Sequence, residues 1–202
     1  MTNYRAAIAA YILEQARPPD KYSHQPRLYQ LATQVGTELA YDDDILYAAA
    51  WLHDLGVFIG HRPEDSVALS SWDNVAYAME RAPELLRSFG FPEAKIAAVS
   101  VAIRDHLPSS EPTSIEGSIL RDADILEQLG ATGILRTVSK VGRDTRFHNF
   151  GDALAALQLN LNNLPASLRL PAARQLAEPR IALLQAFLAG AIAEAAGASY
   201  LD

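Results

Sequence analysis

The chain has 202 residues, half of them hydrophobic, with no cysteine and a formal net charge of −7 at pH 7. This length and composition favour a single domain with one sizeable core. Without cysteine, disulfides, thiolate nucleophiles and cysteine-based zinc or iron–sulfur sites are excluded, so any metal must be held by histidines, carboxylates or water. The acidic charge argues against a general nucleic-acid surface, which needs lysine and arginine to neutralise phosphates.

Two apolar stretches bear on targeting and on membrane insertion. Arg5 and Glu14 bracket the N-terminal apolar stretch, and no small-residue cleavage site follows a basic segment, so we expect no signal peptide. The longest strongly apolar uncharged run, residues 181–193, has 13 residues, whereas a membrane-spanning helix needs about 20. We therefore expect a soluble, cytoplasmic protein that does not enter a membrane.

Apolar residues recur at intervals of three and four along nearly the whole chain, and alternating β-branched residues are almost absent. This period predicts an all-α fold. Capping residues, glycines and prolines indicate where one helix stops and the next begins. The predicted helices cover residues 3–16, a segment capped by Ser23 and running to about Leu39, and residues 43–55, 67–89, 92–105, 114–129, 152–163 and 171–196.

The adjacent pair His53-Asp54 follows an apolar segment, residues 45–52, that must be largely buried. Two consecutive ionisable groups in such surroundings need a partner, although such a dipeptide also occurs by chance in helical proteins. Asp124 lies among core residues in the same way and needs a cation. Neutral imidazoles combined with carboxylates suit Mn, Fe, Co, Ni or Zn, whereas Mg alone prefers more oxygen ligands.

The order of these residues, with His24 upstream, resembles the HD superfamily of metal-dependent phosphohydrolases, in a bacterial branch of predicted hydrolases. The resemblance covers most of the chain. It implies one compact HD-domain helical bundle over residues 1–202, with a metal-site core over 20–140 and C-terminal helices over 150–198 packed on it. It is carried by residues 23–28, which place Arg27 three positions after His24, by residues 50–56, 90–92 and 103–106, and by residues 122–126 with 129–136.

The resemblance also assigns a metal site. Its ligands would be His24, His53, Asp54 and Asp124, with Asp122 the open alternative to the last of these. The cofactor would be one divalent ion, Mn, Fe, Co, Ni, Zn or Mg. The five histidines of the chain are too few for the six-histidine binuclear pattern of some relatives, so a single ion is favoured.

Further residues have implied roles in catalysis and substrate binding. Asp54 would hold or deprotonate the water, His106 would donate to a leaving oxygen or order that water, and His61 would lie on a loop over the metal. Arg27 and Arg136 would contact phosphate, because guanidinium groups match phosphate oxygens. Ordinary roles compete with each: ion pairing for the arginines, a helix C-terminus for His106 and a solvated loop for His61.

The function implied is hydrolysis of a nucleotide or other small phosphate ester through metal-bound water. Two alternatives stay open: an HD-type hydratase or hydrolase of a small non-phosphate substrate, with an apolar pocket around Phe58, Trp72 and Tyr77, and a regulatory module that holds a nucleotide without turnover. Residues 70–77 depart from the branch, which often has a His-Glu segment there. The expected partner is a small molecule, with no nucleic-acid polymer and no membrane, and a homodimer is left open.

Overall fold

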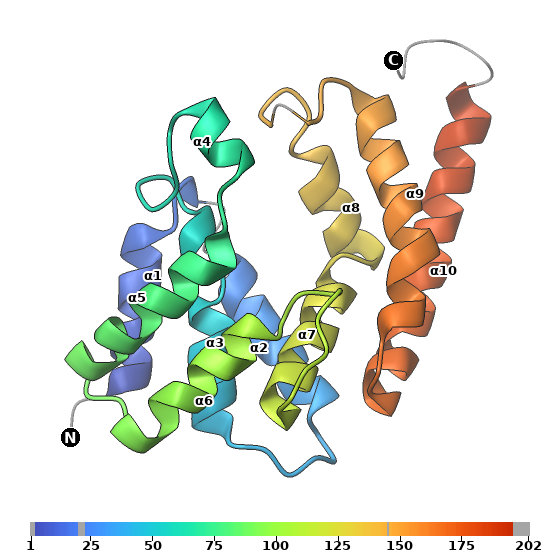
Figure 1. Ribbon diagram of the computed structural model, residues 1–202. Coiled ribbons are helices and arrows are strands. Elements are labelled where there is room, and N and C mark those ends of the chain that lie inside the picture. The colour runs from blue at the N-terminus through green and yellow to red at the C-terminus, as the bar shows by residue number, and fades with distance from the viewer. Residues whose placement is uncertain (1–2, 20–22, 145, 196–202) are drawn as a thin grey trace. The chain divides into compact units, whose positions relative to one another are not determined.

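The computed structural model describes residues 3–19, 23–144 and 146–195, and the all-α fold predicted from the sequence is confirmed there (Figure 1). Within these ranges the structure has no strand, and the Ile59–Arg62 contact is an isolated bridge. The chain separates into two compact units, Met1–Ala123 and Asp124–Asp202. The boundary falls inside one continuous helix, α7 (Ile115–Glu127), so this helix begins in the first unit and ends in the second.

Helix α3 (Asp43–Leu52) forms the centre of the first unit. Its residues 45–52 are all buried, because a segment that is apolar on every side can only be covered by other helices. The covering helices are α1 (Tyr4–Gln15), α2 (His24–Val35) and α6 (Glu93–Arg104). Helix α5 (Asn74–Ser88) packs on α6 and on the short 3-10 turn η2 (Leu55–Val57) that follows α3.

Charged side chains hold the N-terminal end of α3. The carboxylate of Asp42 accepts bonds from the first backbone amides of α3, as expected for an N-cap. Lys95 from α6 contacts Asp42 and Asp44 at 2.8 Å, and Arg5 from α1 contacts Asp44 at 2.7 Å and Asp43 at 2.8 Å. These ion pairs tie three helices together at one end of α3.

The predicted single helix over residues 67–89 is wrong, because the structure has two helices there. Helix α4 (Ser66–Ser70) stops at Ser71, and α5 begins at Asn74. Asp73 caps α5 by accepting a bond of 2.8 Å from the Ala76 amide. The apolar period continues through the break, so only the capping aspartate marks it in the sequence. The helix predicted to run to Leu55 ends at Leu52, and the 3-10 turn follows.

Helices α8 (Gly130–Val138), α9 (Phe150–Ser167) and α10 (Pro171–Ala195) pack against one another in the second unit. Sequence analysis did not predict α8, and it ended α9 at residue 163, whereas the helix continues through Pro165. The predicted end of the last helix, Ala196, and Asp20, the predicted start of the metal-site core, lie outside the described residues.

Helix α10 is longer than the 13-residue apolar run that the sequence suggested. In the described part of the chain it is the helix that is long and apolar enough to cross a membrane, judged by length and composition. One such helix is weak evidence, because core helices of soluble proteins pass the same test. The absence of a membrane-spanning segment and the cytoplasmic location therefore stay predictions.

Candidate metal centre

The centre begins where α2 starts and α3 ends. His24 is the first residue of α2, and His53 follows the last residue of α3. Ser23 directly precedes α2, but its side chain makes no capping bond to the helix. The packing of α2 on α3 brings the two imidazoles together, with their Nε2 atoms 3.3 Å apart. Both rings are buried, with His24 5% and His53 1% exposed.

The protonation of two rings follows from local helix geometry. The Nδ1 atom of His53 lies 3.0 Å from the carbonyl oxygen of Ala50, and that of His106 lies 2.6 Å from the carbonyl oxygen of Ile103. A carbonyl oxygen can only accept a hydrogen bond, so Nδ1 carries a proton in both rings. When such a ring is neutral, its Nε2 atom keeps a lone pair, the form in which histidine binds metals.

Asp54 lies at the step from α3 into η2, with φ −97° and ψ 15°. Its carboxylate oxygens lie 3.6 Å from the Nε2 atoms of both His24 and His53. One ligand atom each from His53, Asp54 and His106 lies within 4.8 Å of the others. His106, which the sequence analysis assigned to proton transfer, thus stands among the candidate ligands. One sequence feature could have marked His106 as a ligand. Like His53, it lies just after the end of a helix.

Helix α7 carries both acidic candidates for the last ligand. The carboxylate of Asp124 and the rings of His24 and His53 offer ligand atoms within 4.8 Å of one another. The Gln128 side chain lies one turn further on and donates to the Asp124 carboxylate over 3.3 Å. Asp122 is fully buried and pairs with Arg121 at 3.1 Å. Among the described residues, the groupings that could hold an ion include Asp124 and not Asp122.

The spacing of the donor atoms fits one small divalent metal ion. Ligands about 2.1 Å from one ion lie roughly 3.0 to 3.4 Å apart at octahedral or tetrahedral angles. The distances of 3.3 Å between the two imidazole nitrogens and 3.6 Å from each nitrogen to Asp54 are close to this range. The donor set of imidazole and carboxylate, with no thiolate in the chain, suits Mn, Fe, Co, Ni or Zn.

The remaining predicted site residues have other contacts. Arg136 pairs with the buried carboxylate of Glu127 at 2.7 Å, and Arg27 lies in the first turns of α2. The ring of His61 lies between two side chains, with Nδ1 2.9 Å from the Tyr77 hydroxyl and Nε2 3.0 Å from Oε1 of Gln15. Burial and the nearby charge of Arg81 lower the pKa of His61, so the ring stays neutral to lower pH.

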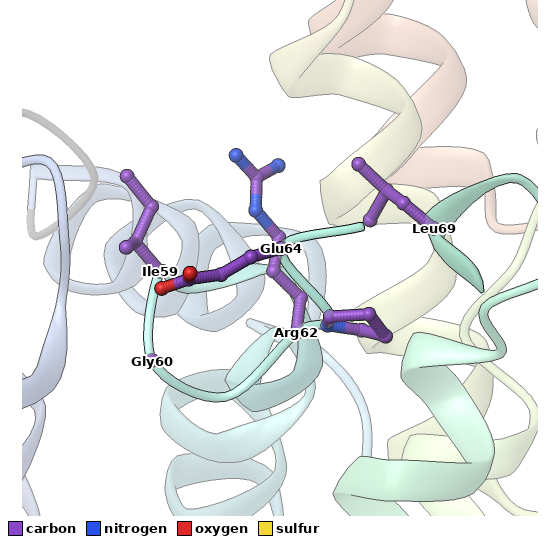
Figure 2. A pocket seen from close by; sticks show the side chains of 6 residues that line it. Ile59, Gly60, Arg62, Glu64 and Leu69 are labelled. Atoms are coloured by element: carbon purple, nitrogen blue, oxygen red, sulfur yellow. The ribbon is translucent and has the colours of Figure 1, made fainter. Parts of the chain in front are cut away.

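The aromatic residues proposed for an apolar pocket are linked by a series of ring contacts that passes through His61. Phe58 packs on His61, His61 on Tyr77, and Tyr77 on Trp72. A separate pocket of about 250 Å³ lies on the loop after η2 (Figure 2). The side chains of Arg62 and Glu64 point in different directions there. The pocket is lined by Ile59, Gly60, Arg62, Pro63, Glu64 and Leu69.

Fold and site together define a class of helical proteins in which histidines and aspartates from helix ends gather to hold a divalent metal. The family model of the HD domain matches residues 22–129, more than half of the chain. The chain therefore belongs to the HD-domain superfamily of metal-dependent hydrolases. The family resemblance found in the sequence is therefore confirmed.

The chain is also similar to individual proteins and solved structures. The chain is 31% identical over 169 residues to the protein YpgQ of Bacillus subtilis, covering 79% of this chain and 76% of that one. The crystal structure of YpgQ in complex with ADP is similar with a TM-score of 0.76, at 24% identity and 98% coverage of both chains. A predicted HD superfamily hydrolase from an uncultured Thermotogales bacterium has a TM-score of 0.65 at 27% identity, covering 94% of this chain and 91% of that one.

Proposed function

We propose that this protein is a metal-dependent phosphohydrolase that cleaves a phosphate ester or anhydride of a nucleotide. The observation that carries the proposal is the convergence of His24, His53 and Asp54 around one point, with the ring protons of His53 turned away from it. The ADP in the YpgQ structure supports a nucleotide as the substrate class.

The ligands proposed for the ion are His24, His53, Asp54 and Asp124. When bound, a divalent ion at these residues would supply activation of a water and polarisation of a phosphoryl oxygen, so that hydrolysis would need no protein nucleophile. The Asp54 carboxylate is a quarter exposed, so it can both contact the ion and take a proton from an attacking water. Oxygen of that water bonds to phosphorus, the bond from phosphorus to the leaving oxygen breaks, and the leaving oxygen receives the proton that Asp54 took up.

The tautomer of His106 restricts its part in this reaction. Because Nδ1 donates to the Ile103 carbonyl, Nε2 of the neutral ring is an acceptor. His106 is therefore suited to bind the ion or to order a water by accepting its hydrogen, and it donates to a leaving oxygen only after gaining a proton. Arg27 is the proposed phosphate contact, whereas Arg136 would have to share its guanidinium with Glu127.

The test is turnover by purified protein that is first freed of metal and then loaded with Mn²⁺, Co²⁺ or Ni²⁺. Nucleoside mono-, di- and triphosphates and a generic phosphomonoester are the substrates, and released phosphate is measured. We expect turnover with at least one ion and none in His53→Ala. A folded, metal-loaded protein that turns over none of these substrates contradicts the proposal. Stoichiometric nucleotide binding without turnover would indicate the regulatory module instead.

A further inference from the structure

We propose that Trp72 is a positioning residue for the metal ligand Asp54, acting through the backbone of Gly56. The inference rests on the proposed metal centre, and it gives a role to the segment where this chain departs from the pattern of its branch. Trp72 does not itself belong to either candidate ligand group.

The direction of the Asp54 carboxylate depends on the turn that follows it. Asp54 is the residue before η2, and its carbonyl accepts a bond of 3.0 Å from the Val57 amide. Its backbone angles are those of a residue that leaves a helix and enters a turn. A shift of the turn therefore moves the peptide that carries the carboxylate.

The junction between α4 and α5 holds this turn from two sides. The indole Nε1 of Trp72 donates to the Gly56 carbonyl over 2.8 Å. On the other side, the Gly56 Cα is so close to Asn74 that an added Cβ would meet the Asn74 backbone at 2.6 Å. The backbone of Trp72 is itself fixed by a bond of 3.2 Å from its amide to the Leu69 carbonyl. The Gly56 carbonyl is thus bound by the Trp72 side chain, and the backbone of Trp72 is fixed at the end of α4.

A second set of contacts supports the indole. The Trp72 and Tyr77 rings lie 5.3 Å apart between centroids, and the Tyr77 hydroxyl lies 2.9 Å from Nδ1 of His61. His61 in turn contacts Gln15 of α1 at 3.0 Å. The segment after Asp54 is therefore held at Gly56 and again at His61, and both contacts lead back to residues 72–77. Side chains that orient a metal ligand typically change metal affinity by about 10- to 100-fold when they are replaced.

The experiment measures metal affinity and stability separately. Trp72→Phe keeps an aromatic ring on Tyr77 and removes the indole N–H. The matched control is Tyr4→Phe, which also loses one side-chain hydrogen bond, the 2.6 Å bond to Asp44, but at the opposite end of α3. Co²⁺ is titrated into each metal-free protein, with its affinity measured by calorimetry and its ligand geometry followed by visible absorption. Thermal unfolding of the metal-free proteins is recorded in parallel.

We expect Trp72→Phe to bind Co²⁺ about tenfold more weakly, with a changed absorption spectrum, and Tyr4→Phe to lose stability with unchanged affinity and spectrum. Unchanged affinity and spectrum in Trp72→Phe would overturn the inference. If Trp72→Phe does not fold, Tyr77→Phe replaces it, with weaker binding expected and unchanged binding contradicting the inference. A parent that binds no Co²⁺ refutes the metal centre itself, whereas a parent that binds Co²⁺ but hydrolyses nothing refutes only the proposed function.

Discussion

The Nε2 atoms of His24 and His53 face each other at 3.3 Å, although the residues are 29 positions apart in the chain. At this distance two N–H groups would collide, so at least one ring must present a lone pair to the other. His53 does so, because its proton is held on the far nitrogen by the Ala50 carbonyl. One cation can accept lone pairs from both rings at once, which is how neighbouring neutral histidines bind a metal.

His53 takes part in both candidate ligand groups, so its loss should remove bound metal. We expect His53→Ala to carry far less metal than the parent after purification and dialysis. His148→Ala, which changes an exposed histidine at the start of α9, should keep the parent's metal content. Elemental analysis of the three proteins checks this. Equal metal content in His53→Ala and the parent would show that the ion binds elsewhere.

Metal binding should also stabilise the fold, because the ligands come from different helices. An ion at a hundredfold excess over its Kd adds about 2.7 kcal/mol, which raises the Tm of a protein of this size by roughly 5 to 10 °C. Scanning calorimetry with Mn²⁺ and with a chelator measures the shift. In His53→Ala the two scans should coincide, and a shift of the same size in that variant would speak against the site.

The sequence predicted the parts of this centre that depend on helix ends. The aspartates at 42–44 and Gly56 placed His53 and Asp54 in the last turn of a helix over residues 43–55. In the structure α3 ends at Leu52, and both residues follow it directly. The packing of α2 on α3 that sets the 3.3 Å approach is a tertiary contact, which no local pattern encodes. The resemblance supplied His24 and favoured Asp124 over Asp122. Asp122 pairs with Arg121 in the structure, and Asp124 as the last ligand stays a prediction.

The role of residues 70–77 could not be predicted for a different reason. The apolar period runs through the α4–α5 break, and the bond from Trp72 to Gly56 joins segments 16 residues apart. Helix α8 was missed because it is short and has Gly130 and Gly133 in its first turns, and glycine lowers helix propensity. Gly133 is nevertheless required there, since an added Cβ would meet the Gln128 carbonyl.

Lys95→Met should reduce stability in a pH-dependent way. The hydrogen bond from Lys95, followed by that from Tyr4, holds the pKa of Asp44 far below its usual range, so the folded state releases this proton more readily than the unfolded state. The stabilisation is therefore complete above the unfolded pKa of about 4 and is lost as the pH falls below it. We expect the variant to be less stable by up to about 1 kcal/mol near neutral pH, with a smaller difference near pH 3.

Urea unfolding of parent and variant at both pH values measures this difference. Arg87→Met is the control, because the Arg87–Glu93 pair is more than half exposed on both sides and should contribute little at either pH. A deficit in Lys95→Met that is the same at both pH values would mean that the loss comes from packing and not from the charge on Asp44.

Alanine substitution should destabilise the protein at Gly56 and stabilise it at Gly190. At Gly56 the new Cβ would meet the Asn74 backbone at 2.6 Å, and overpacking of this kind costs about 1 to 3 kcal/mol. Gly190 lies within α10 with nothing within 4 Å of an added Cβ, so alanine should add up to about 1 kcal/mol through helix propensity. Thermal unfolding compares the two variants, and a Gly56→Ala protein as stable as the parent would contradict the close approach.

The ion pairs and the histidine cluster lie at opposite ends of α3. A helix of ten residues is about 15 Å long, and charges separated by more than about 8 Å are largely screened at physiological ionic strength. The exposed charges of the ion pairs are therefore largely screened from the centre, although one helix joins them. We expect substitutions around Asp44 and Lys95 to change stability with little change in the affinity of the centre for its ion.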